Sequence, residues 1–468
     1  MAADELVDAS GVQKALAEAA GRGADFAEVF VEDKASTFAT LDDGRIEEVS
    51  SGRGRGAGIR VVVGDATGFA HTADLSDVGL VRAAQAAAAA ARSSSDRVVT
   101  VALPAEPSRY VLSVAADPAS IDKARKVGVL LEANEIARSV SGSITQVSAS
   151  YADSRRRILV ANTDGVFASD EVVRTRFNVA CVATGDTGLQ TGSESVGHTT
   201  GFELFDLYDV AELAERAASR ALVKLSARPA PSGVLPVVIG SGGGGVLFHE
   251  ACGHGLEADL VGKGASVFAG RVGELVASPL VTVVDDGTMA GEWGQYSIDD
   301  EGNPARRSVL IENGVLTDYM WDVLRSRKEG RTGSGNGRRE SYQHLPMVRM
   351  TNTYLLGGGD NPDDIIAATP HGVYVKHLAG GQVNTATGDF VFGMSEAYLI
   401  EDGEITEPLR EGNLLGNGPE VLQQIDAVGN DFAMGPPGTC GKDGQGVPVG
   451  DGVPTLRVKA LTIGGTAA

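Results

Sequence analysis

The sequence is poor in cysteine and lacks any long hydrophobic run. Its 468 residues include only three cysteines, Cys181, Cys252 and Cys440. Three are too few for a disulfide framework, and the number is odd, which indicates a reducing compartment. The first eight residues are acidic and lack the apolar segment of a secretory signal. No apolar run approaches the ~20 residues that span a bilayer, so we expect a soluble, cytoplasmic protein without a membrane partner.

Positive charge is also scarce. Lysine and arginine number 40 against 62 aspartates and glutamates, for a formal net charge of −22. Nucleic-acid binding draws on clustered Lys and Arg side chains, so we expect no nucleic-acid partner. The hydrophobic fraction of 43% is typical of a globular protein.

Histidine is rare too, with seven in the chain, yet two of them flank a glutamate in the segment His-Glu-Ala-Cys-Gly-His at residues 249–254. A zinc hydrolase needs neutral imidazoles to hold the metal and a carboxylate to accept a proton from water. On an ideal α-helix, residues five apart diverge by roughly 140°. A π-type turn brings them back into line, and Gly253 and Gly255 would ease that distortion. The sequence therefore predicts a metal site on a locally widened helix, with two ordinary histidines as the alternative.

The residues before this motif favour a strand, at 234–239, followed by a glycine run between Gly240 and Gly245. This run also satisfies the dinucleotide fingerprint, with Glu257 and Asp259 near the expected acidic position. A dinucleotide-binding oxidoreductase is therefore an alternative function. Two observations count against it: four consecutive glycines match many patterns by chance, and no regular alternation of strand and helix follows.

Catalytic zinc usually has three protein ligands and one open position, so a third ligand is required. Cys440, Cys252 and Glu257 are candidates. The remaining histidines are further candidates: His71, His198, His344, His371 and His377. The residues alone leave this choice open.

The pattern of the whole chain predicts an α+β fold with two domains. Helices are expected at residues 10–22, 77–92, 119–140 and 209–226. Strands are expected at 26–31, 37–41, 45–49, 57–63, 68–71, 144–151, 156–161, 165–184, 281–285, 308–311, 372–376, 390–393 and 396–401. Residues 226–233, rich in proline and small side chains, predict a linker. We therefore expect an N-terminal domain of antiparallel strands with packed helices at 1–229, and a mainly antiparallel β domain carrying the motif at 230–468.

Ordered segments of the C-terminal half resemble the TldD type of the TldD/PmbA metallopeptidases, also called the microcin-processing or modulator-of-gyrase family. Residues 249–259 match that family's H-E-x-x-x-H-G-L-E-x-D segment. The likeness continues at 264–268, 284–288, 299–302, 335–342, 350–354, 380–383, 395–400, 428–431 and 440–445. The N-terminal half is similar more loosely, at 41–45, 58–60 and 67–70.

The resemblance implies one Zn²⁺ per chain, held by His249, His254 and Cys440, with Glu250 as the general base. It also implies that Cys252, at a variable position, is a packing residue. The implied substrate is a short or unfolded peptide, bound in extended form by strand addition inside a dimer cavity. The partner would be a second copy or a PmbA/TldE-type paralogue. Such sister subunits lack the zinc motif and do not hydrolyse; a role as such a non-hydrolytic partner is the other alternative, but this chain keeps every metal residue.

Four further residues are candidates for supporting roles. Glu257 is expected to accept a hydrogen bond from a ligand histidine. Arg338 and Arg339 either line the site or form a solvated salt-bridge cluster. Gln382 is expected to lie along an extended substrate.

Overall fold

The computed structural model describes residues 6–21, 23–91, 103–104 and 106–465. The fold is α+β with strands predominating, as predicted. The first strands form one sheet in the order β3-β2-β1-β5-β6-β4, with β7 paired to β6. Their bounds are β1 Phe26–Asp42, β2 Arg45–Val63, β3 Ala66–Thr72, β4 Ser108–Val111, β5 Ile144–Asn162, β6 Phe167–Gly185 and β7 Gly188–His198.

Several strands are longer than the sequence predicts. The expected breaks at 32–36, 50–56 and 152–155 are wrong, because β1, β2 and β5 run through them. β1 is paired with β2 on one side and β5 on the other, so ladder hydrogen bonds carry these strands through stretches without hydrophobic alternation. The expected break between 390–393 and 396–401 is wrong for the same reason, and β4 and β7 are not predicted at all.

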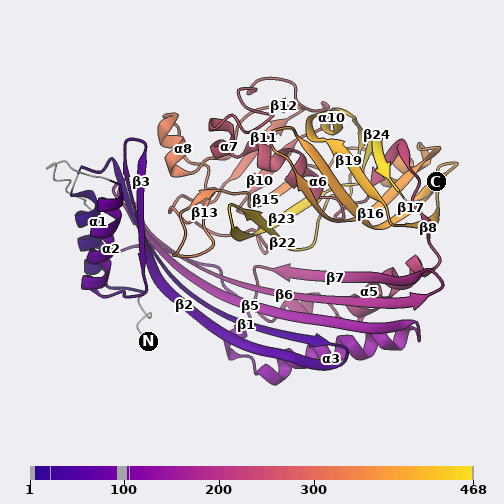
Figure 1. Ribbon diagram of the computed structural model, residues 1–468, viewed down its shortest axis with the longest axis horizontal. Coiled ribbons are helices and arrows are strands. Elements are labelled where there is room, and N and C mark those ends of the chain that lie inside the picture. The colour runs from indigo at the N-terminus through magenta and orange to yellow at the C-terminus, as the bar shows by residue number, and fades with distance from the viewer. Residues whose placement is uncertain (1–5, 22, 92–102, 105, 466–468) are drawn as a thin grey trace.

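The two faces of this sheet contact different parts of the molecule. Val29 and Val31 pack against α1 and α2, and Leu41 packs against α3 and α5. The alternate residues Glu28 and Phe30 face the C-terminal half, where they contact Arg339 and Ile298 respectively. Figure 1 shows the long strands curving beneath the C-terminal half, with α3 on their outer side. The helices are α1 Ala9–Ala20, α2 Asp77–Ala90, α3 Lys123–Val140, α4 Leu204–Leu207 and α5 Val210–Leu225.

Helix ends follow capping residues. α3 begins at Lys123 and not at the predicted residue 119, because the Asp122 carboxylate accepts a hydrogen bond from the Ala124 N–H and Pro118–Ser120 form a separate 3₁₀ turn. The predicted ends at residues 22 and 92 lie outside the described residues. No described helix is both long and apolar enough to cross a membrane.

The C-terminal half contains an eight-stranded sheet in the order β16-β9-β24-β19-β17-β18-β8, with β20 paired to β24. Because β16 also pairs with β17, five of these strands close into a ring. The strands are β8 Arg228–Pro229, β9 Gly233–Ile239, β16 His371–Val383, β17 Asp389–Glu401, β18 Glu404–Arg410, β19 Asn413–Asn417, β20 Ile425–Val428 and β24 Leu456–Gly464. β8 lies inside the predicted linker and pairs with β18; the domain boundary near residue 230 stays a prediction.

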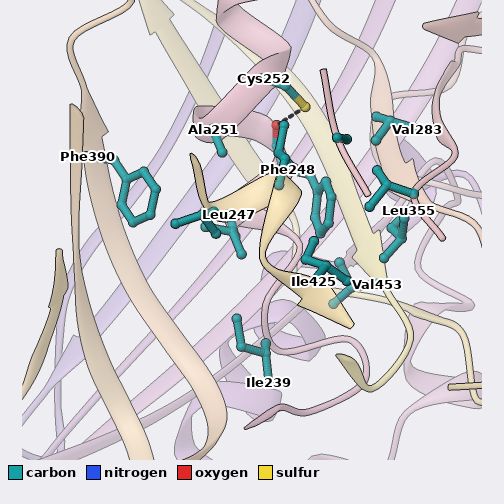
Figure 2. Close-up of a cluster of buried hydrophobic side chains, with 14 of the residues drawn as sticks. Ile239, Leu247, Phe248, Ala251, Cys252, Val283, Leu355, Phe390, Ile425 and Val453 are labelled. Atoms are coloured by element: carbon teal, nitrogen blue, oxygen red, sulfur yellow. Dashed lines mark hydrogen bonds between the residues drawn. The ribbon is translucent and has the colours of Figure 1, made fainter. Parts of the chain in front are cut away.

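A second sheet of this half follows the order β12-β11-β10-β15-β23-β21, with β22 paired to β23. The remaining strands are β10 Val283–Asp286, β11 Arg307–Glu312, β12 Val315–Leu316, β13 Gly337–Arg338, β14 Met347–Val348, β15 Asn352–Leu355, β21 Ala433–Met434, β22 Gly438–Lys442 and β23 Gln445–Val453. The helices are α6 Val246–Phe248, α7 Ala258–Gly262, α8 Val323–Lys328, α9 Pro362–Ala367 and α10 Gly418–Gln423. One hydrophobic core joins both sheets to α6, with Ile239, Leu247, Phe248 and Leu355 packed together (Figure 2).

Candidate metal centre

The two motif histidines lie at the ends of one helical turn. α6 continues into a π-helical turn, His249–Gly253, and then a 3₁₀ turn, His254–Leu256. The His254 N–H donates to the His249 carbonyl, which is an i→i+5 hydrogen bond. The two ring centroids are 4.9 Å apart. The predicted π-type turn is confirmed, and it brings histidines five residues apart onto one side of the helix.

The glycines of this segment are explained by close packing. A Cβ at Gly253 would lie 2.3 Å from the Met350 sulfur, and one at Gly255 would lie 2.7 Å from the Phe268 ring. Neither glycine has a positive φ, so the close packing, and not a left-handed backbone, requires a residue without a side chain at these two positions. The motif can therefore sit directly on the hydrophobic core.

Cys440 reaches the histidines from a distant hairpin. It lies in β22, where it pairs with Val447 of β23. Its sulfur is 3.4 Å from the His254 Nε2, across 186 residues of sequence. One ligand atom from each of His249, His254 and Cys440 can be chosen so that all three lie within 4.8 Å of one another. Of the candidates that the sequence left open, Cys440 is the one that the described structure groups with both histidines.

Cys252 points elsewhere. Its sulfur donates to the Phe248 carbonyl at 3.3 Å, among the buried side chains of the core (Figure 2). Burial raises the pKa of the Cys252 thiol to about 12. Burial would also raise the pKa of Cys440, but the charges and hydrogen bonds of His249 and His254 outweigh it and lower the pKa to about 4. Only Cys440 is therefore poised to offer a thiolate.

The donor set suits a zinc ion. Two imidazoles and one thiolate are ligands that zinc accepts in tetrahedral sites, and three protein ligands leave one position open. The Nδ1 of His249 is buried and has no hydrogen-bond partner among the described residues. A buried polar atom without a partner costs free energy. A metal ion bound at the His249 ring would offset this cost.

A second layer of charged groups lies behind His254. Its Nδ1 is 3.1 Å from the Glu257 Oε2, as predicted for Glu257. Lys442 donates to the same oxygen at 2.9 Å and to the Asp259 Oδ1 at 2.8 Å. Burial by itself would raise the pKa of Glu257, but the charges and hydrogen bonds of His254 and Lys442 outweigh it and lower the pKa. The sequence reasoning missed Lys442, although its position two residues after Cys440 in a strand places both side chains on one face.

These groups open onto a cleft of about 600 Å³. His249, Glu250 and His254 line one wall, and Cys440 and its hairpin line another. Burial raises the pKa of the Glu250 carboxyl. Asp451 lines the cleft from β23, and the sequence did not indicate it. Burial raises the pKa of Asp451 to about 6, although the His249 charge acts to lower it.

Of the supporting candidates, Gln382 lines this cleft. Arg338 and Arg339 do not, and the expected solvated cluster is wrong because both are buried. Arg338 donates to the Met350 carbonyl. Arg339 pairs with Glu28 and lies 4.3 Å from the Phe30 ring centroid, so it joins the two halves of the molecule. The sequence could not show this, because the partners are more than 300 residues away.

The glycine run before the motif serves packing. A Cβ at Gly243 would lie 1.8 Å from the Lys376 carbonyl oxygen, and one at Gly245 would lie 2.1 Å from the Asp451 Oδ1. The helix that follows, α6, has three residues before the π-helical turn. These contacts account for the glycines without a bound phosphate, and nothing in the described loop favours the dinucleotide alternative.

With this site in place, the chain can be assigned to a class. Three family models match it: PmbA/TldA metallopeptidase domain 1 at residues 27–91, the central domain at 116–225 and the C-terminal domain at 232–465. The chain belongs to the PmbA/TldD metallopeptidase family.

Individual relatives are similar over most of their length. The chain is 41% identical over 455 residues to a metalloprotease TldD homolog of Haemophilus influenzae, covering 95% of this chain and 94% of that one. It is 32% identical to a zinc metalloprotease TldD homolog of Saccharolobus solfataricus over 276 residues, 58% of this chain and 61% of that one. The crystal structure of TldE from Thermococcus kodakarensis has the same fold, with a TM-score of 0.76 at 22% identity, over 97% of this chain and 99% of that one.

Proposed function

We propose that the protein is a zinc-dependent peptidase in which His249, His254 and Cys440 hold one Zn²⁺ per chain. The convergence of two imidazoles and a low-pKa thiol beside the Glu250 carboxylate carries this proposal. The name of the Saccharolobus relative, a zinc metalloprotease, supports the choice of metal. When bound, Zn²⁺ polarises the scissile carbonyl and acidifies water.

Glu250 is the general base of this proposal. It lies in the cleft beside both histidines and is not one of the three metal-ligating residues. Burial raises its pKa, which brings a carboxylate closer to the neutral range where proton transfer is efficient. Glu250 accepts the proton of the attacking water and returns it to the leaving amine. Glu257 and Lys442 hold the His254 ring in the orientation that leaves its Nε2 facing Cys440.

The substrate is a short or unfolded peptide in extended form. Gly381, Gln382 and Val383 pair with β17 on one side. Among the described residues no strand pairs with their other edge, and these residues line the cleft. A free strand edge can accept a peptide as an added strand. Gln382 lies where it can contact such a peptide.

The active assembly is a dimer, formed with a second copy or with a TldE-type paralogue. The structural likeness to a TldE supports the paralogue, because two chains of one fold can form a pseudo-symmetric pair. This chain is the catalytic member of such a pair, since it carries the complete set of His249, Glu250, His254 and Cys440. We further propose the division into an N-terminal domain at 1–229 and a C-terminal domain at 230–468, in a protein of the cytoplasm.

Metal analysis tests the proposal. The purified protein should contain about one zinc per chain, lose it together with peptidase activity on treatment with a chelator, and regain both when zinc is restored. A protein that is metal-free as isolated, gains no activity with zinc and binds NAD would refute it.

A further inference from the structure

A small cavity separates the concave face of the long sheet from the C-terminal half, and none of His249, Glu250, His254 and Cys440 lines it. Its volume is about 60 Å³. At roughly 10–15 Å³ for each water centre, it has room for a few waters or one compact ion. Lys34 of β1 and Arg174 of β6 line it from the sheet, and Arg338 lines it from the other side together with residues 446–448 of β23.

Strand register concentrates positive charge at this point. Lys34 lies directly opposite Arg156 in the β1–β5 pair, and Arg174 lies opposite Ser154 in the β5–β6 pair. Like charges directly opposite each other destabilise a sheet. Arg156 is balanced by Glu32 and Asp300, and Arg339 is balanced by Glu28. Lys34, Arg174 and Arg338 make no such direct ion pair within the described residues.

Three of these cations have no carboxylate partner among the described residues. Arg174 donates only to the carbonyls of Trp293 and Gln295. Arg338 donates to a carbonyl and lies 5.2 Å from the Tyr296 ring centroid. Lys34 is half-buried, and within the described chain its ammonium makes no direct hydrogen bond or ion pair, although the charges of Glu32 and Glu340 partly offset that of Arg156.

The mutual repulsion of these cations contributes to lowering their pKa values. Burial, followed by the charges of Arg338 and Arg156, lowers the pKa of Arg174 to about 9. Burial and the Arg156 charge likewise lower the pKa of Lys34. Burying cations without a direct ion pair is costly, so an anion bound among these three groups would stabilise them.

The carboxylates that line the cavity are bound to other donors. Asp170 accepts from the N–H groups of Ser297 and Ile298, and Glu340 accepts from the Gly446 N–H. Asp300 is held by Arg156. Asp299 accepts from backbone N–H groups, and burial raises its pKa to about 7, which weakens its negative charge near neutral pH.

We propose that this cavity binds one compact inorganic oxyanion of the sulfate or phosphate type, held by Lys34, Arg174 and Arg338. The anion joins the long sheet to the C-terminal half and lies against β23, which pairs with the Cys440 strand. Multiple charge-assisted N–H donors are the groups that oxyanions prefer. This site is independent of zinc and of peptide hydrolysis.

Calorimetric titration of the full-length protein with sodium sulfate tests the site, with sodium chloride at matched ionic strength as the reference. We expect saturable binding of one sulfate per chain, equal before and after chelator treatment. Lys34→Gln should weaken it by about tenfold or more, since one hydrogen bond between charged groups is lost. Lys34 is half-buried and makes no direct ion pair within the described chain, so this variant should fold, as circular dichroism will verify.

Lys459→Gln is the matched control, because it removes the same charge from an exposed position on β24. It should bind sulfate as the unaltered protein does. Absence of saturable sulfate binding in the unaltered protein would overturn the proposal, as would equal affinities in the Lys34 and Lys459 variants. Loss of zinc or of peptidase activity would leave the sulfate result unchanged, so the two proposals fail separately.

Discussion

Two buried cysteines, one inside the His249–His254 motif and one facing it across the cleft, have surroundings that give them opposite chemistry. Cys252 belongs to the motif itself and points into the hydrophobic core, where the pKa of its thiol is about 12. Cys440 belongs to a hairpin on the far side of the cleft, and the two histidines lower its pKa to about 4. Both side chains are almost fully buried, so burial does not decide between them. The difference in pKa comes from the charges and hydrogen-bond donors that face each sulfur.

The largest expected effect comes from the cleft cysteine. Cys440→Ser should abolish peptide cleavage and weaken zinc binding, because a hydroxyl is not ionised near neutral pH and is a harder ligand than a thiolate. Zinc content by mass spectrometry and cleavage of an unfolded peptide are the measurements. A serine variant that kept full zinc and turnover would contradict the proposed ligand set.

Glu250→Gln separates the base from the ligands. The variant should retain about one zinc per chain and lose roughly 10²–10⁴-fold in kcat, the usual contribution of a general base. The amide keeps the size of the side chain but cannot accept the proton. If zinc were lost as well, Glu250 would have to be counted among the ligands.

Lys442→Met tests how far the hairpin supports the motif. It removes the ammonium that joins Glu257 to Asp259, and we expect about a 10–100-fold loss of zinc affinity or activity, as for other groups that orient a ligand. Lys442→Arg should recover part of it. Exposed Lys263 offers the control, since Lys263→Met changes the same charge outside this network. Equal losses in the Lys442 and Lys263 variants would refute a positioning role.

The core cysteine should have the smallest functional effect. Cys252→Ala should leave zinc content and turnover largely intact and lower the free energy of unfolding by about 1 kcal/mol, through the small cavity it leaves. Chemical denaturation and the same cleavage assay measure the two quantities. Loss of zinc here would return Cys252 to the candidate ligands.

Local sequence was enough for several features, because they depend on residues close in the chain. The β1–β2 hairpin turns at Asp43 and Gly44, both at positive φ, a conformation that an Asp-Gly pair favours. The five-residue spacing of His249 and His254 predicts the π-type turn, since no other helical geometry aligns the two rings. Glu257 lies three residues beyond His254, within reach of its Nδ1.

Tertiary structure decided what the local pattern left open. Spacing could not choose Cys440 over Cys252, because only the packing of β22 against the motif brings its sulfur to His254. Arg339 pairs with Glu28, and Lys34 and Arg338 line one cavity, only when the long sheet folds beneath the C-terminal half. β1, β2 and β5 likewise run through stretches without hydrophobic alternation because neighbouring strands satisfy their hydrogen bonds. Sequence thus determined the chemistry of the residues and their local turns, whereas long-range strand pairing decided which of them meet.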